Sequence, residues 1–174
     1  FINNILACIS TMFVLNLNLN KMKKKFIGFE IPEGRGDIKI IKKFNKRFKF
    51  IDESYNANLL SMTSAINNMD YYNDNKNHRK LVLLGDMLEL GKKSKKFHRT
   101  LSVIINRSNI DKVFVCGKYI KETFNYLSTN KKGKVFKNIK EAHNHFKKIL
   151  HNNDLLMVKG SNATGLNQFS KNIK

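Results

Sequence analysis

Several residue types that mark particular classes of protein are scarce in this chain of 174 residues. It has no tryptophan, one proline and two cysteines. Cys8 and Cys116 lie in separate apolar runs, and neither has a cysteine or histidine neighbour at a spacing that would bind a metal. A disulfide framework is therefore excluded, and we expect two buried thiols in a reduced, cytosolic protein.

Long hydrophobic runs are also missing. The most apolar stretch, residues 5–17, is interrupted by Ser10, Thr11 and Asn16, and it is shorter than the roughly 20 residues that a membrane span requires. The sequence shows no basic start followed by a small-residue cleavage site, so a signal peptide is not expected. We expect a soluble, cytoplasmic chain without a membrane partner.

Acidic residues are few, because 13 Asp and Glu stand against 33 Lys and Arg, for a formal charge of +20. One interpretation is a basic nucleic-acid-binding module. The basic residues are scattered, however, without an arginine-dense stripe, and the chain is also rich in Asn and Ile. A compositional bias that acts on every surface position therefore explains the charge as well, and we expect no dedicated nucleic-acid partner.

The first part of the chain is expected to be helical. Residues 2–15 have helical periodicity, and a second short helix is expected over residues 19–27. A proline and three glycines then interrupt regular structure in residues 28–36, so we expect a hinge there between domains of residues 1–36 and 37–174. Because the chain opens inside an apolar helical pattern, without an initiator Met or a helix cap, we expect a piece of a longer protein.

From residue 37 onward, patterns typical of strands alternate with patterns typical of helices. Strands separated by helices imply right-handed crossovers, so we expect an α/β fold: a Rossmann-like three-layer domain with a mainly parallel sheet. No GxGxxG follows a strand pattern, so a dinucleotide site of the usual kind is not expected. The expected strands span residues 38–41, 48–51, 81–84, 113–116, 135–136 and 155–158, and the expected helices span residues 60–72, 94–106, 119–127, 139–150 and 166–173.

Polar residues stand where three of the expected strands end. They form the segment 52–58, the pair Gly85-Asp86 and the triplet Lys159-Gly160-Ser161. Open α/β sheets bind ligands at the carboxyl edge of their strands. We therefore expect the three segments to converge on one binding cleft, where the lysine and hydroxyl of the triplet would suit a carboxylate or a phosphate.

These residues also have purely structural interpretations. Tyr55, Asn56 and Asn58 suit a short zwitterionic peptide, which needs several hydrogen-bond donors and acceptors. The same cluster would commonly cap the helix that follows, and both uses can coexist. Asp86 suits either the ammonium group of an incoming amine or the capping of a turn.

Three blocks of the sequence resemble the C-terminal part of the Mur ligases in their order and spacing. They are Asp52-Glu53-Ser54-Tyr55-Asn56-Ala57-Asn58, Leu84-Gly85-Asp86-Met87-Leu88-Glu89-Leu90-Gly91 and Val158-Lys159-Gly160-Ser161-Asn162. Folylpolyglutamate synthases share the superfamily, but the Tyr-Asn-Ala-Asn cluster favours the branch that adds D-alanyl-D-alanine. The resemblance implies that residues 1–36 end a central ATP-binding domain and that residues 37–174 form the C-terminal domain.

The resemblance also implies roles for single residues. Asn4 stands where Mur ligases carry an asparagine that pairs with the adenine edge of ATP, and Arg35 stands where an arginine reaches the nucleotide. Glu53 replaces the aspartate that usually accepts from the ribose hydroxyls, and Leu59 replaces a usual proline. His98 lies in the family's accustomed place, although a lone helical histidine is more often structural. The residues expected to bind substrate are Tyr55, Asn56, Asn58, Asp86, Lys159 and Ser161.

The implied activity is that of an ATP-dependent amide-forming ligase of peptidoglycan precursor synthesis. Its partners would be UDP-N-acetylmuramoyl-tripeptide and D-alanyl-D-alanine, and we expect a monomer. The sequence has no GxxxxGK[ST] phosphate loop, metal-ligand cluster or catalytic triad. In the Mur ligases the phosphate loop and the magnesium ligands lie upstream of the part that this chain resembles. The resemblance therefore implies that ATP and Mg²⁺ bind mainly upstream, and no catalytic residue is assigned within the chain. A noncatalytic piece that docks to the remainder of a split ligase is an alternative.

Overall fold

The structure of the protein, a computed structural model, divides into two compact units. The first unit comprises residues 1–31 and the second comprises residues 32–174. The residues that the structure describes are 2–18, 20, 32–72 and 78–174.

The described part of the first unit consists mainly of helix α1 (Ile2–Val14), as its periodicity predicts. Most of its apolar side chains are exposed, because the described residues of this unit offer little for them to pack against. Cys8 is exposed on this helix, so the expectation of a buried thiol is wrong for Cys8 and confirmed for Cys116. The helix predicted over residues 19–27 falls almost entirely outside the described residues.

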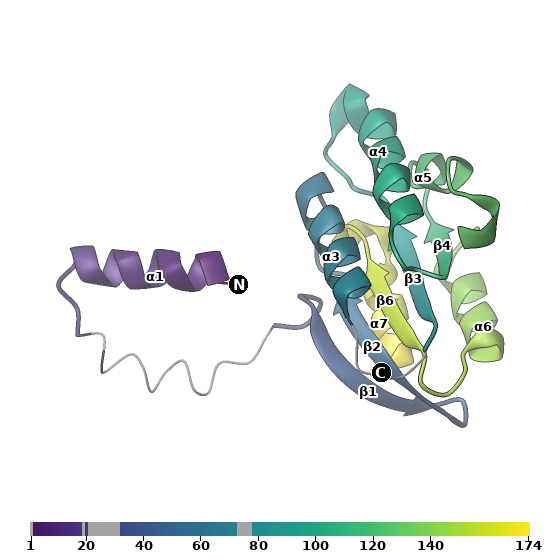
Figure 1. Ribbon diagram of the computed structural model, residues 1–174, viewed down its shortest axis with the longest axis horizontal. Coiled ribbons are helices and arrows are strands. Elements are labelled where there is room, and N and C mark those ends of the chain that lie inside the picture. Colours follow the sequence, from purple (N-terminus) through teal and green to yellow (C-terminus); the bar gives the residue numbers. More distant parts are fainter. Residues whose placement is uncertain (1, 19, 21–31, 73–77) are drawn as a thin grey trace. The chain divides into compact units, whose positions relative to one another are not determined.

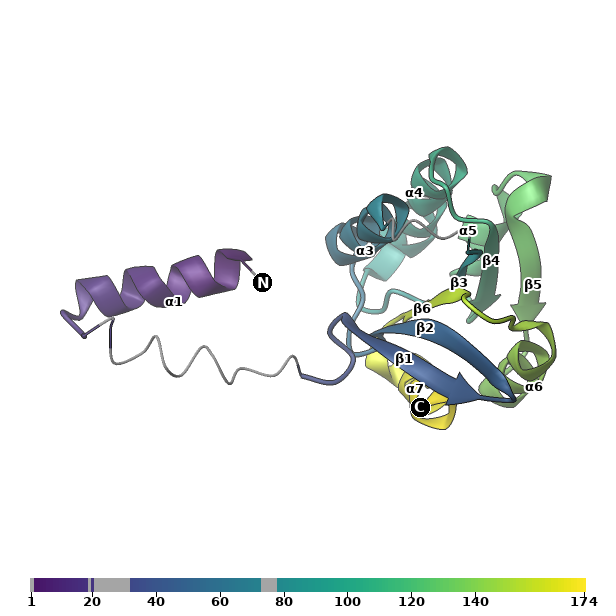
Figure 2. The same ribbon diagram turned by 60° about the horizontal axis from the view of Figure 1, so that its bottom comes forward.

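The second unit is built on one six-stranded sheet (Figures 1 and 2). The strands lie in the order β1-β2-β6-β3-β4-β5, with β1 antiparallel to β2 and the remaining pairs parallel. The prediction of an α/β fold with a mainly parallel sheet is thereby confirmed. The strand bounds are β1 (Asp37–Lys43), β2 (Lys46–Glu53), β3 (Lys80–Gly85), β4 (Lys112–Cys116), β5 (Lys132–Phe136) and β6 (Leu155–Lys159).

Helices cover both faces of the sheet. Figure 2 shows α3 and α4 on one side and α6 and α7 on the other, which gives the predicted three layers. No helix in the described part of the chain is long and apolar enough to cross a membrane. The helix bounds are α3 (Leu59–Tyr71), α4 (Ser94–Arg107), α5 (Lys121–Asn125), α6 (Ile139–Ile149) and α7 (Leu166–Ile173), with short 3₁₀ turns η1 (Gly91–Lys93), η2 (Thr129–Lys131) and η3 (Asn162–Thr164).

The core consists of two apolar clusters, one on each face of the sheet. Val82 and Leu84 of β3 pack in the cluster under α3 and α4, whereas Leu81 and Leu83 pack in the cluster under α6 and α7. Successive side chains of a strand point to opposite faces, so a strand covered on both sides must be apolar at every position. The continuous run of residues 81–84 is therefore a direct consequence of the three layers.

The strand order brings the three polar segments to one edge of the sheet. β6 lies between β2 and β3 and is parallel to both (Figure 1). The register pairs Lys159 at the end of β6 with Glu53 of β2 and with Leu84 of β3. The loops that follow these three strands therefore start side by side.

The segment before β1 is fixed to the end of β2. The Gly36 N–H donates to the Asp52 carbonyl at 2.7 Å, and the Tyr55 N–H donates to the Gly34 carbonyl at 3.2 Å. These bonds attach residues 34–36 to the second unit. The division between the two units accordingly falls between residues 31 and 32, within the predicted hinge.

Candidate functional site

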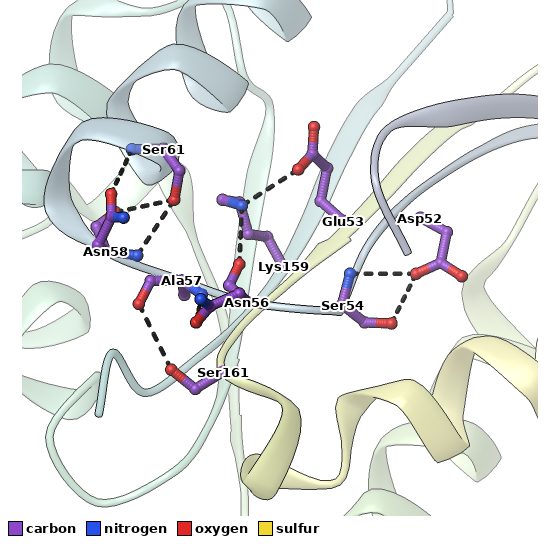
Figure 3. A network of polar contacts seen from close by, with 9 residues as sticks. All are labelled: Asp52, Glu53, Ser54, Asn56, Ala57, Asn58, Ser61, Lys159 and Ser161. Carbon is purple, nitrogen blue, oxygen red and sulfur yellow. Dashed lines mark hydrogen bonds and ion pairs between the residues drawn. The ribbon is translucent and has the colours of Figure 1, made fainter. Parts of the chain in front are cut away.

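The loops after β2, β3 and β6 meet at one serine. The Ser161 N–H donates to the Asp86 carbonyl at 3.0 Å, and the Ser161 hydroxyl accepts from the Leu88 N–H at 3.0 Å. The same hydroxyl donates to the Ala57 carbonyl at 3.4 Å (Figure 3). The predicted convergence of the three segments is thereby observed.

The close approach of two strand ends requires a glycine directly after β6, between Lys159 and Ser161. A Cβ at Gly160 would lie 3.0 Å from the Gly85 Cα and 2.7 Å from a Leu166 methyl carbon. A side chain here would push β6 away from β3. In the Lys-Gly-Ser triplet, the lysine and the serine thus supply polar groups, and the glycine allows the chain after β6 to approach the end of β3 closely.

A cleft of about 580 Å³ opens where the three loops meet. Of the predicted substrate-binding residues, Tyr55, Asn56, Asn58 and Ser161 line it, whereas Asp86 and Lys159 do not. Tyr55, Asn56 and Asn58 are exposed at its surface. The full lining consists of residues 55–58, 88–90 and 161–163.

Two asparagines of the cleft also make local backbone contacts. The Asn58 side chain accepts from the Ser61 N–H at 2.8 Å, and the Ser61 hydroxyl accepts from the Asn58 N–H at 3.1 Å, which forms a capping box at the start of α3. The Asn56 side-chain oxygen accepts from the Ala57 N–H at 2.7 Å. The structural interpretation of Asn58 as a helix cap is therefore confirmed, and Asn58 also lines the cleft.

Lys159 is buried behind the cleft, with 2% of its surface exposed. Its ammonium group donates to Glu53 Oε2 and to the Asn56 carbonyl, each at 3.1 Å (Figure 3). Glu53, assigned to the ribose hydroxyls, is thus an ion-pair partner of Lys159, assigned to the substrate. The two predicted ligand-binding residues are brought together, and they bind each other.

Asp86 is buried and organises the loop between β4 and α5. Its carboxylate accepts N–H groups from Lys118, Tyr119 and Ile120 at 2.7 to 2.9 Å. Gly117 precedes them with a φ of +155°, and a Cβ there would come within 2.5 Å of Asp86 Oδ1. These contacts match the alternative in which Asp86 caps a turn.

His98 of α4 forms a hydrogen bond with the loop after β3. Its Nε2 accepts from the Met87 N–H at 2.9 Å, and its Nδ1 lies 2.8 Å from the Ser94 carbonyl. This arrangement requires a neutral ring with the proton on Nδ1. Burial lowers the pKa of His98 below its usual value and keeps the ring neutral. The structural interpretation of His98 fits these contacts.

Arg35 lies at the edge of the cleft against Tyr55. The guanidinium carbon is 4.3 Å from the centroid of the Tyr55 ring, and Arg35 is exposed. An exposed guanidinium held over an aromatic ring keeps its donors free for a bidentate anion such as a phosphate. Asn4 is exposed on α1 in the other unit.

Asp52 is a buried acid of the site that the sequence did not single out. Its Oδ1 accepts from the Ser54 hydroxyl at 2.6 Å and from the Ser54 N–H at 3.1 Å, while Oδ2 lies 2.9 Å from the Lys174 ammonium group. Burial is the largest influence on its pKa and acts to raise it, but the hydrogen bonds from Ser54 and Lys174 together outweigh burial. The pKa of Asp52 therefore lies below its ordinary 3.8. Its signal in the sequence was its place as the first acid of the 52–58 segment.

A larger cavity elsewhere on the described surface does not involve the predicted site residues. A cavity of about 880 Å³ opens at the opposite edge, near the amino ends of β3 and β4, and none of the predicted site residues lines it. Among the described residues there is no group of three or more His, Cys, Asp or Glu that could hold a metal ion.

Comparison with protein families and curated proteins gives consistent matches. A family model described as "Mur ligase, glutamate ligase domain" matches residues 38–162. The chain is 29% identical over 168 residues to the UDP-N-acetylmuramoyl-tripeptide--D-alanyl-D-alanine ligase of Rickettsia prowazekii (strain Madrid E), which covers 97% of this chain and 36% of the relative. It is 34% identical over 167 residues to the protein of the same name from Buchnera aphidicola subsp. Baizongia pistaciae (strain Bp), which covers 95% of this chain and 34% of that relative. The chain spans about a third of the length of these relatives.

Solved structures share the fold. One crystal structure of MurF from Acinetobacter baumannii matches with a TM-score of 0.77 at 22% identity, over 96% of this chain and 36% of that chain. MurF ligase from Thermotoga maritima in complex with ADP matches with a TM-score of 0.74 at 19% identity, over 97% of this chain and 36% of that chain. Both likenesses concern the α/β architecture.

Proposed function

This chain belongs to the Mur ligase family, and we propose that it is the C-terminal part of an ATP-dependent ligase that adds D-alanyl-D-alanine to UDP-N-acetylmuramoyl-tripeptide. The reaction would serve peptidoglycan precursor synthesis. The curated relatives named above carry this activity in their names. The observation that supports it most in the structure is the single cleft formed by the loops after β2, β3 and β6.

The chemistry of the cleft suits a short zwitterionic peptide. The side chains of Tyr55, Asn56 and Asn58 supply neutral donors and acceptors for an amide and a carboxylate. Leu88 and Ala163 add apolar surface on other sides of the cleft, which suits the two methyl groups of D-alanyl-D-alanine. We infer that this cleft holds the dipeptide.

The proposed reaction joins the dipeptide's amine to the terminal carboxylate of the tripeptide. ATP phosphorylates that carboxylate, the amine attacks the resulting acyl phosphate, and phosphate leaves. Such a step gains most from correct positioning and from neutralising phosphate charge. The contribution of this chain is to hold the amine donor and to exclude water when it closes on the nucleotide-bearing domain.

The nucleotide would be bound mainly by a part of the protein outside this chain. Arg35 is the described residue best suited to reach a phosphate, because its guanidinium is exposed at the rim of the cleft. Asn4 and Glu53 keep their proposed roles at the adenine and the ribose. Mg²⁺ would also be held upstream and would neutralise phosphate charge, and we propose a monomeric, cytoplasmic enzyme.

A chimeric enzyme tests the proposal. The C-terminal third of the Rickettsia prowazekii relative is replaced by residues 1–174, and amide product is measured by mass spectrometry together with ADP release. We expect product that requires ATP, UDP-N-acetylmuramoyl-tripeptide and D-alanyl-D-alanine, with no product from the 174-residue chain alone. A folded chimera that binds ATP but forms no amide product would count against the proposed function.

A further inference from the structure

The lysine at the end of β6 has its charge turned away from the cleft. Lys159 is almost fully buried, it does not line the cleft, and its ammonium group lies between Glu53 Oε2 and the Asn56 carbonyl. Two of its three hydrogen-bond donors are therefore used within the protein. A ligand in the cleft would therefore contact residues 55–58, which line it, and not Lys159, which lies behind them.

Ser161 points to the same side of the sheet as Lys159. Leu155 and Met157 of β6 pack in the cluster under α3, and side chains two residues apart in a strand share a face. Continuing this alternation beyond the strand places residues 159 and 161 beneath the loop between β2 and α3. Each of them donates a hydrogen bond to a main-chain carbonyl of that loop. The two carbonyls belong to the consecutive residues Asn56 and Ala57 (Figure 3).

The hydroxyl of Ser161 also fixes the facing side of the cleft. It accepts from the Leu88 N–H while it donates to the Ala57 carbonyl. One hydroxyl thus sets the spacing between the loop that carries Asn56 and Asn58 and the loop that carries Leu88. Removing it would leave the Leu88 N–H and the Ala57 carbonyl without this partner.

We propose that Lys159 and Ser161 are positioning residues of the dipeptide site. By holding the carbonyls of Asn56 and Ala57 from beneath, they turn the side chains of Tyr55, Asn56 and Asn58 outward into the cleft. Preorganised side chains lose less conformational freedom when a ligand binds, so the two residues set the affinity for the dipeptide without supplying its main contacts. The identity of the ligand rests on the proposed function.

Matched controls exist at the opposite edge of the sheet. Lys131 is also buried and donates to two main-chain carbonyls, those of Ser108 and Ile110. Ser108 donates to the Ile105 carbonyl and accepts from the Ile110 N–H, as Ser161 donates to one carbonyl and accepts from one N–H. Lys131→Met and Ser108→Ala therefore reproduce the chemical change away from the cleft.

The experiment compares Lys159→Met and Ser161→Ala with these two controls. In the chimeric enzyme, the two cleft variants are expected to raise KM for D-alanyl-D-alanine about tenfold, the effect of losing one or two hydrogen bonds. In Ser161→Ala, which leaves the ion pair between Lys159 and Glu53 in place, KM for ATP should stay within about twofold. Ser161→Thr, which keeps the hydroxyl, should restore dipeptide KM. In the 174-residue chain alone, amide hydrogen exchange should quicken in residues 55–58 and at Leu88. The controls should lower the thermal midpoint without changing dipeptide KM or this exchange.

The outcomes separate this inference from the proposed function. If the unaltered chimera makes no amide product, the proposed function fails, while hydrogen exchange on the chain alone still decides whether Lys159 and Ser161 hold the segment. Unchanged exchange at residues 55–58, or an equal KM effect in the controls, would overturn the positioning role. Lys159→Met leaves the Glu53 carboxylate unpaired. If this variant fails to fold for that reason, the double variant Glu53→Gln/Lys159→Met, which removes the carboxylate charge, is studied by the same hydrogen-exchange measurement.

Discussion

Arg35 and Tyr55 are in direct contact although the sequence assigned them to different ligands. The guanidinium of Arg35 lies over the Tyr55 ring, and Tyr55 lines the cleft. If Arg35 binds a nucleotide phosphate and Tyr55 faces the dipeptide, the two ligands are separated by one side-chain contact. Such proximity is what attack of an amine on an acyl phosphate requires.

Replacing Arg35 with Lys is expected to weaken ATP binding about tenfold, because an ammonium group cannot make the bidentate contact of a guanidinium. The dissociation constant is measured by isothermal titration on the chimeric enzyme. Arg99→Lys is the matched control, since Arg99 also lies 4.3 Å from a tyrosine ring, that of Tyr126 on another part of the surface. An ATP affinity that is the same in Arg35→Lys and Arg99→Lys would reject the assignment of Arg35.

Asp52 makes the stability of the second unit sensitive to acid. Because its pKa is lowered in the folded chain, its ionised form stabilises the fold above the unfolded pKa of about 4, and this contribution is lost as the pH falls through the folded pKa. We expect the thermal midpoint of the unaltered chain to fall more steeply between about pH 5 and pH 2.5 than that of Asp52→Asn. Ser54→Ala removes the hydroxyl hydrogen bond, which is one of those that lower the pKa, and keeps the bond from the backbone N–H, so it should reduce the slope in part. Equal slopes in all three proteins would disprove this role of Asp52.

The sequence indicated which residues lie at the site better than it indicated what they bind. Asp86 and Lys159 were placed correctly at strand ends, but Asp86 binds main-chain groups of another loop, and Lys159 binds the Glu53 carboxylate and a main-chain carbonyl. The N–H groups that Asp86 accepts belong to residues 118–120, far along the chain. A pattern of residue types cannot show which distant backbone groups a loop will bring to a carboxylate.

At the scale of single elements, most predicted strands and helices agree with the structure to within a few residues. The agreement is best where burial dictates the pattern, as in residues 81–84 of β3. Helix α5 is shorter than the prediction of residues 119–127 and begins at Lys121. The N–H groups of residues 118–120, just before α5, bind the Asp86 carboxylate, a contact between distant parts of the chain that the local pattern does not show.

The start of α3 combines a structural and a proposed functional role in one residue. Asn58→Ala removes the helix cap and is expected to cost about 1 kcal/mol of unfolding free energy, measured by urea denaturation. Asn138→Ala removes the cap of α6, where the side chain accepts from the Glu141 N–H, and should cost a similar amount. Only Asn58→Ala should also raise KM for D-alanyl-D-alanine in the chimeric enzyme. Equal KM values in the two variants would show that Asn58 serves as a cap alone.

At the scale of the whole molecule, several lysines connect separate elements through hydrogen bonds to main-chain carbonyls. Lys131 donates to carbonyls of the loop before β4, Lys112 donates to the Asn130 carbonyl, and Lys43 donates to the Asn172 carbonyl. These ammonium groups fasten one element to another. Because the carbonyls are neutral, each of these ammonium groups still contributes to the formal charge of +20.

A gel-shift titration tests the alternative of a nucleic-acid-binding module. We expect any binding of the chain to duplex or single-stranded DNA at about 20 mM salt to disappear by about 150 mM, because scattered lysines give only nonspecific, counterion-driven association. Binding that persists at the higher salt and depends on sequence would favour a nucleic-acid partner. A basic protein of similar length and similar net charge, without a nucleic-acid partner, serves as the control for nonspecific association.

The fold class could be predicted from the sequence, whereas the order of strands could not. Alternation of strands and helices indicates a parallel sheet wherever it occurs. Nothing in the local pattern shows that β6 is inserted between β2 and β3, since that position depends on pairs such as Lys49 with Leu155 and Lys80 with Leu155, which are far apart in the chain. The convergence of the three polar segments could be predicted without the strand order, because open α/β sheets bind ligands at the carboxyl edge of their strands.

The central position of β6 has a consequence during synthesis of the protein. Translation produces β6 after the other five strands, so until residues 155–161 leave the ribosome the β1–β2 hairpin has no parallel neighbour and β3 has one open edge. Nascent chains would expose these edges and the apolar faces beside them, a state that favours aggregation and slows folding. Newly made copies should therefore depend on chaperones until the final strand is inserted.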